Sequence, residues 1–226
     1  MSAAVTQIDF RISPKTVQRQ AVETLRAAIV AGVFEPGDRL IEAELCVLLG
    51  ISRPSVREAL RSLEAGKLVA VAPNRGFFVP MLSWAEAEEI YKVRALLEAE
   101  AAALFTPRAT PEHLRQMRAA LSEFRSSIKS DDRILQVAST SRFYEPILYG
   151  CGNRIIHEVL EGLMARITFL RARSMSRAGR ARFSLREMTA ILDAIKARDV
   201  EGARAAARRH VENACAAARL AYSAAT

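Results

Sequence analysis

Three arginines recur at intervals of four residues in the stretch GISRPSVREALRSLEAGKLV, as Arg53, Arg57 and Arg61. On a helix this spacing places all three guanidinium groups on one face. A guanidinium can donate to a phosphate or, in bidentate fashion, to the O6 and N7 atoms of guanine. The residues are therefore suited to binding nucleic acid, although an ordinary solvated helix face has the same spacing.

The elements predicted around these arginines are those of a winged helix-turn-helix. Apolar positions predict a helix over about 16–31, a short helix near 42–49, and a third helix from Ser52 as N-cap to about residue 65. The segments LVAV, PNRG and FFV then predict a strand, a tight turn and a strand. In such a domain the second helix of the motif enters the major groove of DNA. This order favours DNA binding over a merely solvated face.

The candidate DNA contacts lie at the start of the third helix and in the hairpin. Arginines in the first two turns of that helix can reach base edges, and serines at its start can donate to phosphate. An arginine at the hairpin tip can enter a minor groove. We expect the interface to consist of Ser52, Arg53, Ser55, Arg57, Asn74, Arg75 and Gly76.

Strand signals end near residue 80, and we expect two domains, 1–80 and 81–226. Helix-start signals occur at Ser83 with Glu86 and at Thr110 with Pro111. Further helices are predicted near 132–149, 154–175, 183–198 and 200–222. The chain is thus predicted to be mainly α, with an N-terminal winged helix-turn-helix and a C-terminal all-α bundle of about six helices.

Composition and charge narrow the function classes. Among 226 residues, 33 basic and 25 acidic side chains give a net charge of +8, which favours an anionic partner. We find no signal peptide and no apolar run of the length that spans a bilayer. The three cysteines are far apart and have no metal-ligand spacing. We expect a cytoplasmic protein with no membrane segment.

The segment DRLIEAELCVLLGISRPSVREALRSLEAGKLVAVAPNRGFFV resembles the winged-helix domain of the GntR family of bacterial transcription regulators. The likeness covers residues 16–80, and its most specific part is SRPSVREAL. The resemblance implies that the arginines at 53 and 57 contact the operator, assisted by the neighbouring serines and the wing glycine, Gly76. Some relatives carry an arginine near Ala43, so that base contact is not expected here.

The second domain resembles the FCD ligand-binding domain of the FadR-type GntR subfamily. The likeness lies in YKVRALLEAEAAALF, RFYEPILYGCGN and REMTAILDAIKARDVEGARAAARRH. Many such domains hold a divalent metal with an Asp, a His four residues later and two further histidines. Those four positions are Thr140, Tyr144, Met188 and His210 here, a set that does not make an ordinary metal site. We expect no metal and no cofactor.

Arg94 corresponds to an arginine that often faces the effector pocket of this family. It can grip a carboxylate, or it can pair with Glu98 within its own helix. His210 can equally be an ordinary packed core histidine, and Asn153 matches the asparagine of the family's Gly-Asn segment. The candidate effector site is Arg94, Thr140, Tyr144, Asn153, Met188 and His210.

We therefore expect a homodimeric, ligand-responsive regulator and not an enzyme. Its expected partners are a double-stranded DNA operator and a small carboxylate effector that releases a repressor from DNA. Two alternatives stay open: a metabolic enzyme with a DNA-binding arm, and a sugar-responsive regulator with an α/β effector domain. The arginine-rich run over 166–186 is interpreted as a solvated helix end and loop.

Overall fold

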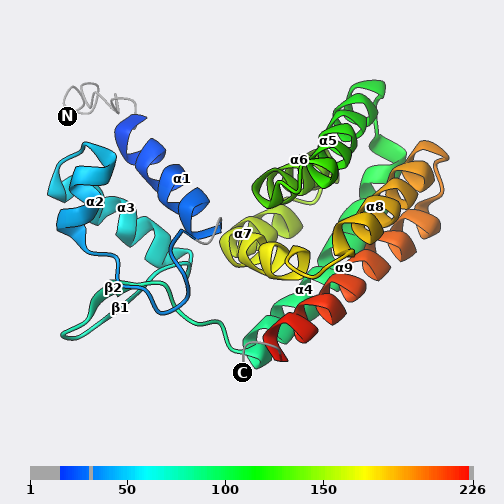
Figure 1. Ribbon diagram of the computed structural model, residues 1–226. Coiled ribbons are helices and arrows are strands. Elements are labelled where there is room, and N and C mark those ends of the chain that lie inside the picture. The colour runs from blue at the N-terminus through cyan, green and yellow to red at the C-terminus, as the bar shows by residue number, and fades with distance from the viewer. Residues whose placement is uncertain (1–15, 31–32, 224–226) are drawn as a thin grey trace, which may run out of the picture.

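The computed structural model describes residues 16–30 and 33–223, and helices dominate them. The first part of the chain folds as three helices followed by an antiparallel hairpin (Figure 1). Its elements are α1 (Thr16–Val30), α2 (Glu42–Leu49), α3 (Arg53–Ala65), β1 (Ala70–Ala72) and β2 (Gly76–Phe78). The predicted order of a winged helix-turn-helix is confirmed.

Helix α3 buries one face and exposes the other, as its spacing predicts. Val56, Ala59, Leu60 and Leu63 are buried, and they form one core with apolar side chains of α1. The arginine stripe lies on the opposite, exposed face. Gly50 ends α2 with φ 64°, a left-handed conformation that glycine adopts without strain, so the chain turns directly into α3.

The hairpin pairs Ala70 with Phe78 and Ala72 with Gly76, and an isolated bridge from Arg39 extends it on one side. Its turn places Asn74 at φ 63° and Gly76 at φ 73°. Both values lie in the left-handed region, which asparagine and glycine tolerate better than other residues. The predicted tight turn therefore has a direct cause in its sequence.

The second part is a helical bundle with one short 3-10 turn. Within the described ranges its elements are α4 (Trp84–Phe105), η1 (Thr106–Arg108), α5 (Pro111–Lys129), α6 (Arg133–Gly150), α7 (Arg154–Met175), α8 (Arg180–Lys196) and α9 (Val200–Ser223). Both predicted helix starts are confirmed: Ser83 forms a capping box with Glu86, and Thr110 forms one with His113. The predicted start near 183 is wrong by one turn, because α8 begins at Arg180 directly after Gly179.

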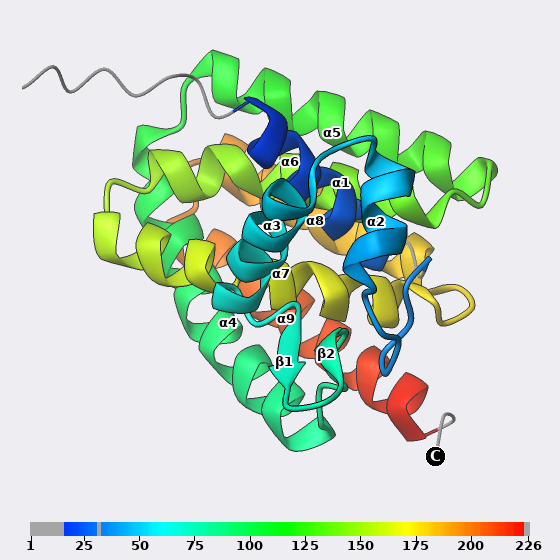
Figure 2. The same ribbon diagram turned by 90° about the vertical axis from the view of Figure 1, so that its left-hand side faces the viewer.

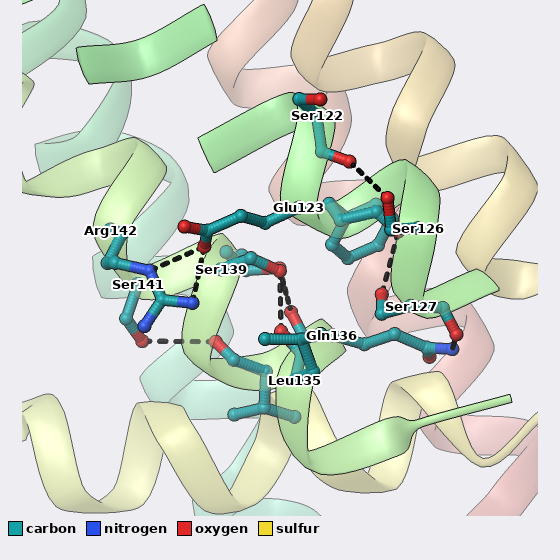
Figure 3. Close-up of polar contacts among 12 residues, drawn as sticks. Ser122, Glu123, Ser126, Ser127, Leu135, Gln136, Ser139, Ser141 and Arg142 are labelled. Carbon is teal, nitrogen blue, oxygen red and sulfur yellow. Dashed lines mark hydrogen bonds and ion pairs between the residues drawn. The ribbon is translucent and has the colours of Figure 1, made fainter. Parts of the chain in front are cut away.

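Helices α5 and α6 form an antiparallel pair with polar contacts along their seam (Figure 3). Arg142 donates from Nε to Oε2 of Glu123 at 2.8 Å, and Gln136 donates to the carbonyl of Ser127 at 3.4 Å. The first contact is exposed and the second is buried, and both join the two helices. The buried face of α6 carries Thr140 and Tyr144.

The bundle contacts the winged domain through α7, which lies next to α1 (Figures 1 and 2). One hydrophobic core spans residues 21–79 and the other spans 87–218. Phe169 of α7 packs against both cores. A domain boundary at residue 80 stays our prediction, and the two cores lie on either side of it.

Candidate DNA interface and buried polar centre

The arginines at the start of α3 share one carboxylate. Glu42, the first residue of α2, accepts from Nε of Arg57 at 2.9 Å and from its Nη2 at 2.9 Å. It also accepts from Nε of Arg53 at 2.8 Å. The side chain of Glu42 is 14% exposed, whereas those of Arg53 and Arg57 are 67% and 57% exposed. The hydrogen bonds from Arg57 and then Arg53 lower the pKa of Glu42 to about 2.

An open groove of about 940 Å³ runs along this face of α3. Its lining brings three cationic side chains and one carboxylate to the surface. The residues are Gln18, Arg53, Pro54, Arg57, Glu58, Arg61 and Ser62. A concave surface with an excess of arginine is suited to a phosphate backbone.

The structure shows contacts of the two serines and of Arg75 that the sequence does not predict. Ser52 is the N-cap of α3 but makes no capping bond with its side chain; its hydroxyl lies 2.9 Å from that of Ser55. Arg75 donates to the carbonyl of Gly37 at 2.6 Å and stacks over the Phe78 ring. The guanidinium of Arg75 is therefore folded against the wing, and it must leave this contact to enter a minor groove.

Four of the predicted effector residues lie in the interior of the bundle. Thr140, Tyr144, Met188 and His210 are all buried, and the rings of Tyr144 and His210 stack with centroids 6.0 Å apart. Burial raises the pKa of the Tyr144 phenol, so the hydroxyl stays protonated. That hydroxyl has no hydrogen-bond partner within residues 16–30 and 33–223.

Arg94 is buried and paired, which is the second of its two predicted alternatives. Its Nε donates to Oε1 of Glu98 at 2.7 Å, and its Nη1 has no partner in the described part of the chain. Burial disfavours the charge of Glu98, but the fields of Arg94 and Arg171 outweigh it, and the pKa of Glu98 is lowered. The pair is therefore ionised inside the bundle.

Arg171 joins this centre, contrary to the sequence interpretation. It is 4% exposed, donates to the hydroxyl of Ser141 at 3.0 Å, and lies 5.3 Å from the ring centroid of Tyr144. Burial and then the charge of Arg94 lower its pKa. The interpretation of the arginine-rich run as solvated is wrong here and at Arg180, which is 6% exposed.

Glu187 is a further residue that the sequence analysis missed, although it precedes the singled-out Met188. Its carboxylate accepts two bonds from Arg180, at 2.9 and 2.8 Å, and one from Asn213 at 2.8 Å. Nδ1 of His210 lies 2.8 Å from Oε2 of the same carboxylate. Burial opposes the charge of Glu187, but the bonds from His210 and Arg180 bring its pKa to about 2. Because Glu187 is ionised, Nδ1 of neutral His210 carries the proton and donates it.

Asn153 serves as a helix cap. Its Oδ1 accepts from the backbone N–H groups of Ile155 and Ile156, both at 3.1 Å, at the start of α7. It also lines a surface pocket of about 300 Å³ beside Tyr149 and His157. The structure thus gives Asn153 a role in starting α7, and no contact that joins it to the buried effector candidates is found among the described residues.

The donor set at the metal positions does not fit a divalent ion. Thr140 donates its hydroxyl to the carbonyl of Gln136 at 2.8 Å, Tyr144 keeps its proton, and Met188 offers only a thioether. One nitrogen of His210 is engaged by Glu187. Across the described residues, no group of three or more His, Cys, Asp or Glu side chains is arranged to hold a metal. Zn²⁺ and similar ions require more imidazole or carboxylate than this.

Comparison with protein families gives two matches that together cover most of the chain. The model of bacterial regulatory proteins of the gntR family matches residues 17–79. The FCD domain model matches residues 89–213, which is more than half of the chain. The chain belongs to the GntR family. It is a transcription regulator with a DNA-binding helix-turn-helix and an FCD domain.

Similar proteins carry the same architecture. An uncharacterized HTH-type transcriptional regulator, YdhC of Bacillus subtilis (strain 168), is 30% identical over 211 residues, covering 92% of this chain and 93% of its own. The galactonate operon transcriptional repressor of Escherichia coli (strain K12) is 30% identical over 208 residues, covering 82% and 90%. The solved structure of E. coli McbR/YncC superposes with a TM-score of 0.81 at 26% identity, covering 96% of this chain and all of that one.

These findings bear on the two open alternatives. The all-α second domain excludes a regulator with an α/β effector domain. The similar proteins are named as transcriptional regulators, not as enzymes. No helix in the described ranges is long and apolar enough to cross a membrane.

Proposed function

We propose that this GntR regulator is a cytoplasmic homodimer that represses transcription and leaves its operator when a small organic anion binds its FCD domain. Helix α3 reads the operator through Arg53 and Arg57. Ser52 and Ser55 contact phosphates, and the wing supports them through Asn74, Arg75 and Gly76. The similarity to a galactonate operon repressor supports repression, and galactonate is itself a carboxylate.

The observation that carries the effector proposal is Arg171. Its guanidinium is buried, and among the residues that the structure describes no carboxylate is paired with it. The hydroxyl of Ser141 is its hydrogen-bond partner, but a hydroxyl does not neutralise a buried cation, and an entering anion would do so. The buried Nη1 of Arg94 and the hydroxyl of Tyr144 lack partners nearby, so three residues offer donors to one carboxylate.

The net charge of the buried centre also supports an anionic effector. Three buried guanidinium groups, those of Arg94, Arg171 and Arg180, accompany two carboxylates, those of Glu98 and Glu187. With His210 neutral, the centre has an excess of one positive charge. One monoanionic carboxylate balances this excess, and no metal is required to hold it. Thr140 and Met188 are proposed to line the space that the carboxylate occupies.

The proposal is tested with a panel of small carboxylates and with DNA that the protein enriches from a random-sequence pool. At least one acid is expected to raise the unfolding temperature and to release the DNA. Arg171→Met should abolish both effects while leaving DNA binding unchanged. The matched control is Arg177→Met, which removes the same charge from an exposed position of the same run.

An acid that acts equally on wild type and Arg171→Met would place the effector elsewhere. Enrichment of no sequence from the pool would contradict the proposed operator binding. Neutral sugars alone releasing the DNA would contradict the choice of an anion. Mass spectrometry of a small molecule that co-purifies with the protein gives an independent identification.

A further inference from the structure

The carboxylate of Glu42 lies under the two arginines that are proposed to read DNA. It belongs to the first turn of α2, and the left-handed Gly50 brings that turn against the first turns of α3. Arg53 and Arg57 are four residues apart on one face, and Glu42 accepts from both of them. The two arginines remain more than half exposed, so solvent faces their outer edges.

The geometry leaves the reading edge of each guanidinium available. A guanidinium has five N–H donors. Arg53 gives Glu42 only its Nε–H, and Arg57 gives Nε–H and one hydrogen of Nη2. In Arg53, the edge formed by Nη1 and Nη2 is left for another acceptor. In Arg57, the same edge keeps the Nη1 hydrogens and the second Nη2 hydrogen. That edge can donate to O6 and N7 of guanine in bidentate fashion.

We propose that Glu42 is a positioning residue that sets the DNA specificity of this regulator. It holds Arg53 and Arg57 with their outer edges directed at base pairs, and it weakens their attraction to any phosphate. The inference rests on the proposed operator contact of α3.

The hydrogen bonds from the two arginines to Glu42 have two consequences: they align the arginines for base contact, and they favour cognate over non-cognate DNA. A free arginine loses side-chain freedom when it docks on a base pair, and an arginine already held by Glu42 loses less, which favours the cognate site. Non-cognate DNA offers mainly phosphates, and its affinity grows with the positive charge that faces them. Glu42 reduces the charge of the two arginines together from two to one. With a pKa near 2 it keeps its negative charge at any pH at which the protein works.

The test compares Glu42→Gln with wild type on two DNA duplexes at several salt concentrations. One duplex carries the sequence that wild type enriches from a random pool, and the other carries a scrambled version. The isosteric amide should raise affinity for the scrambled duplex several-fold and lower affinity for the enriched one. We expect the ratio of the two affinities to fall by about tenfold. Binding to the scrambled duplex should also show a steeper salt dependence, by about 0.9 in log–log slope for each additional phosphate contact.

Glu44→Gln is the matched control, because Glu44 is an exposed acid in the first turn of the same helix. It removes the same charge without releasing Arg53 or Arg57, so the affinity ratio should stay within about twofold of wild type. A second test repeats Glu42→Gln in an Arg57→Ala background. There only Arg53 is released, and the change in salt slope should be about half as large.

An unchanged affinity ratio in Glu42→Gln, with an unchanged unfolding temperature, overturns the proposal. So does a ratio that falls equally in Glu44→Gln, because the effect is then one of general charge. If Glu42→Gln does not fold, Glu42→Asp is used instead, because it keeps the charge but shortens the reach. A reduced affinity ratio with a salt slope like that of wild type supports the positioning role. An unchanged affinity ratio contradicts it. Failure of wild type to enrich any sequence is a separate outcome, and it removes the operator contact on which the proposal rests.

Discussion

Arg94 and Glu98 form an ion pair within one turn of α4, with Nε 2.7 Å from Oε1 and side chains that are 1% and 2% exposed. A pair of this spacing on a protein surface contributes little to stability. Inside the bundle each charge depends on the other, because neither can be solvated by water. The pair therefore links the proposed effector site to the folding of the whole FCD domain.

The first prediction concerns this pair. Arg94→Met should lower the free energy of unfolding by about 3–5 kcal/mol, because it leaves the Glu98 carboxylate buried with its direct partner removed. The double variant Arg94→Met/Glu98→Leu should recover much of that loss, since both charges are gone. Urea denaturation measures each value. Lys92→Met breaks an exposed pair with Glu88 on the same helix and should change stability by less than about 1 kcal/mol.

Stability should fall as the solution becomes acidic, and His210 should contribute to that fall. Burial, the largest effect, lowers the pKa of His210 below its ordinary value of 6.5 even though Glu187 opposes it. Below about pH 6.5 the unfolded chain takes up a proton that the folded chain resists. The stability is therefore complete above pH 6.5 and is lost as pH falls, with a slope of up to about 1.4 kcal/mol per pH unit for this group.

The measurement for His210 is the free energy of unfolding between pH 5 and pH 7.5. His210→Gln should show a flatter dependence than wild type over this range. Equal slopes in wild type and His210→Gln would show that the buried imidazole does not titrate as its surroundings require.

Arg57→Ala should weaken binding to the enriched DNA by about tenfold or more at each half-site, because a bidentate base contact is lost. The fold should be unaffected, since the side chain is more than half exposed. Fluorescence anisotropy with a labelled duplex gives the affinity, and circular dichroism gives the fold. Wild-type affinity in this variant would refute the assignment of α3 as the reading helix.

Light scattering should give about twice the chain mass of 24.9 kDa for the free protein, and two chains plus one duplex for the complex with DNA. A winged helix reads only a short half-site, and two copies are needed for the affinity of a specific regulator. The enriched sequence should accordingly contain a pseudo-palindrome. A single chain on a single half-site would contradict the proposed dimer.

The sequence predicts the winged domain well because its signals are local. The spacing of Val56, Leu60 and Leu63 and the break at Gly50 act within one or two turns, and so do the capping boxes of the bundle. The metal positions of the family are placed on this chain only through the resemblance, and the absence of a metal there stays a prediction.

The buried centre could not be read in this way. Arg171 and Arg180 look like members of an exposed arginine run until tertiary packing buries them. Glu187 meets His210 across 23 residues of sequence, and Glu42 meets Arg57 across 15. No periodic pattern encodes such pairs, because they depend on how separate helices are placed against one another.

Phe169 and Arg171 lie on the same helix, two residues apart. On an α-helix that separation is about 3 Å along the axis and roughly 200° around it, so the two side chains project from nearly opposite sides. Phe169 packs against the core of the winged domain, while Arg171 reaches the polar centre of the bundle. If an anion draws Arg171 toward it by rotating α7, we expect Phe169 to turn by the same angle against the core of the DNA-binding domain. Effector binding would then change the contact between the two domains.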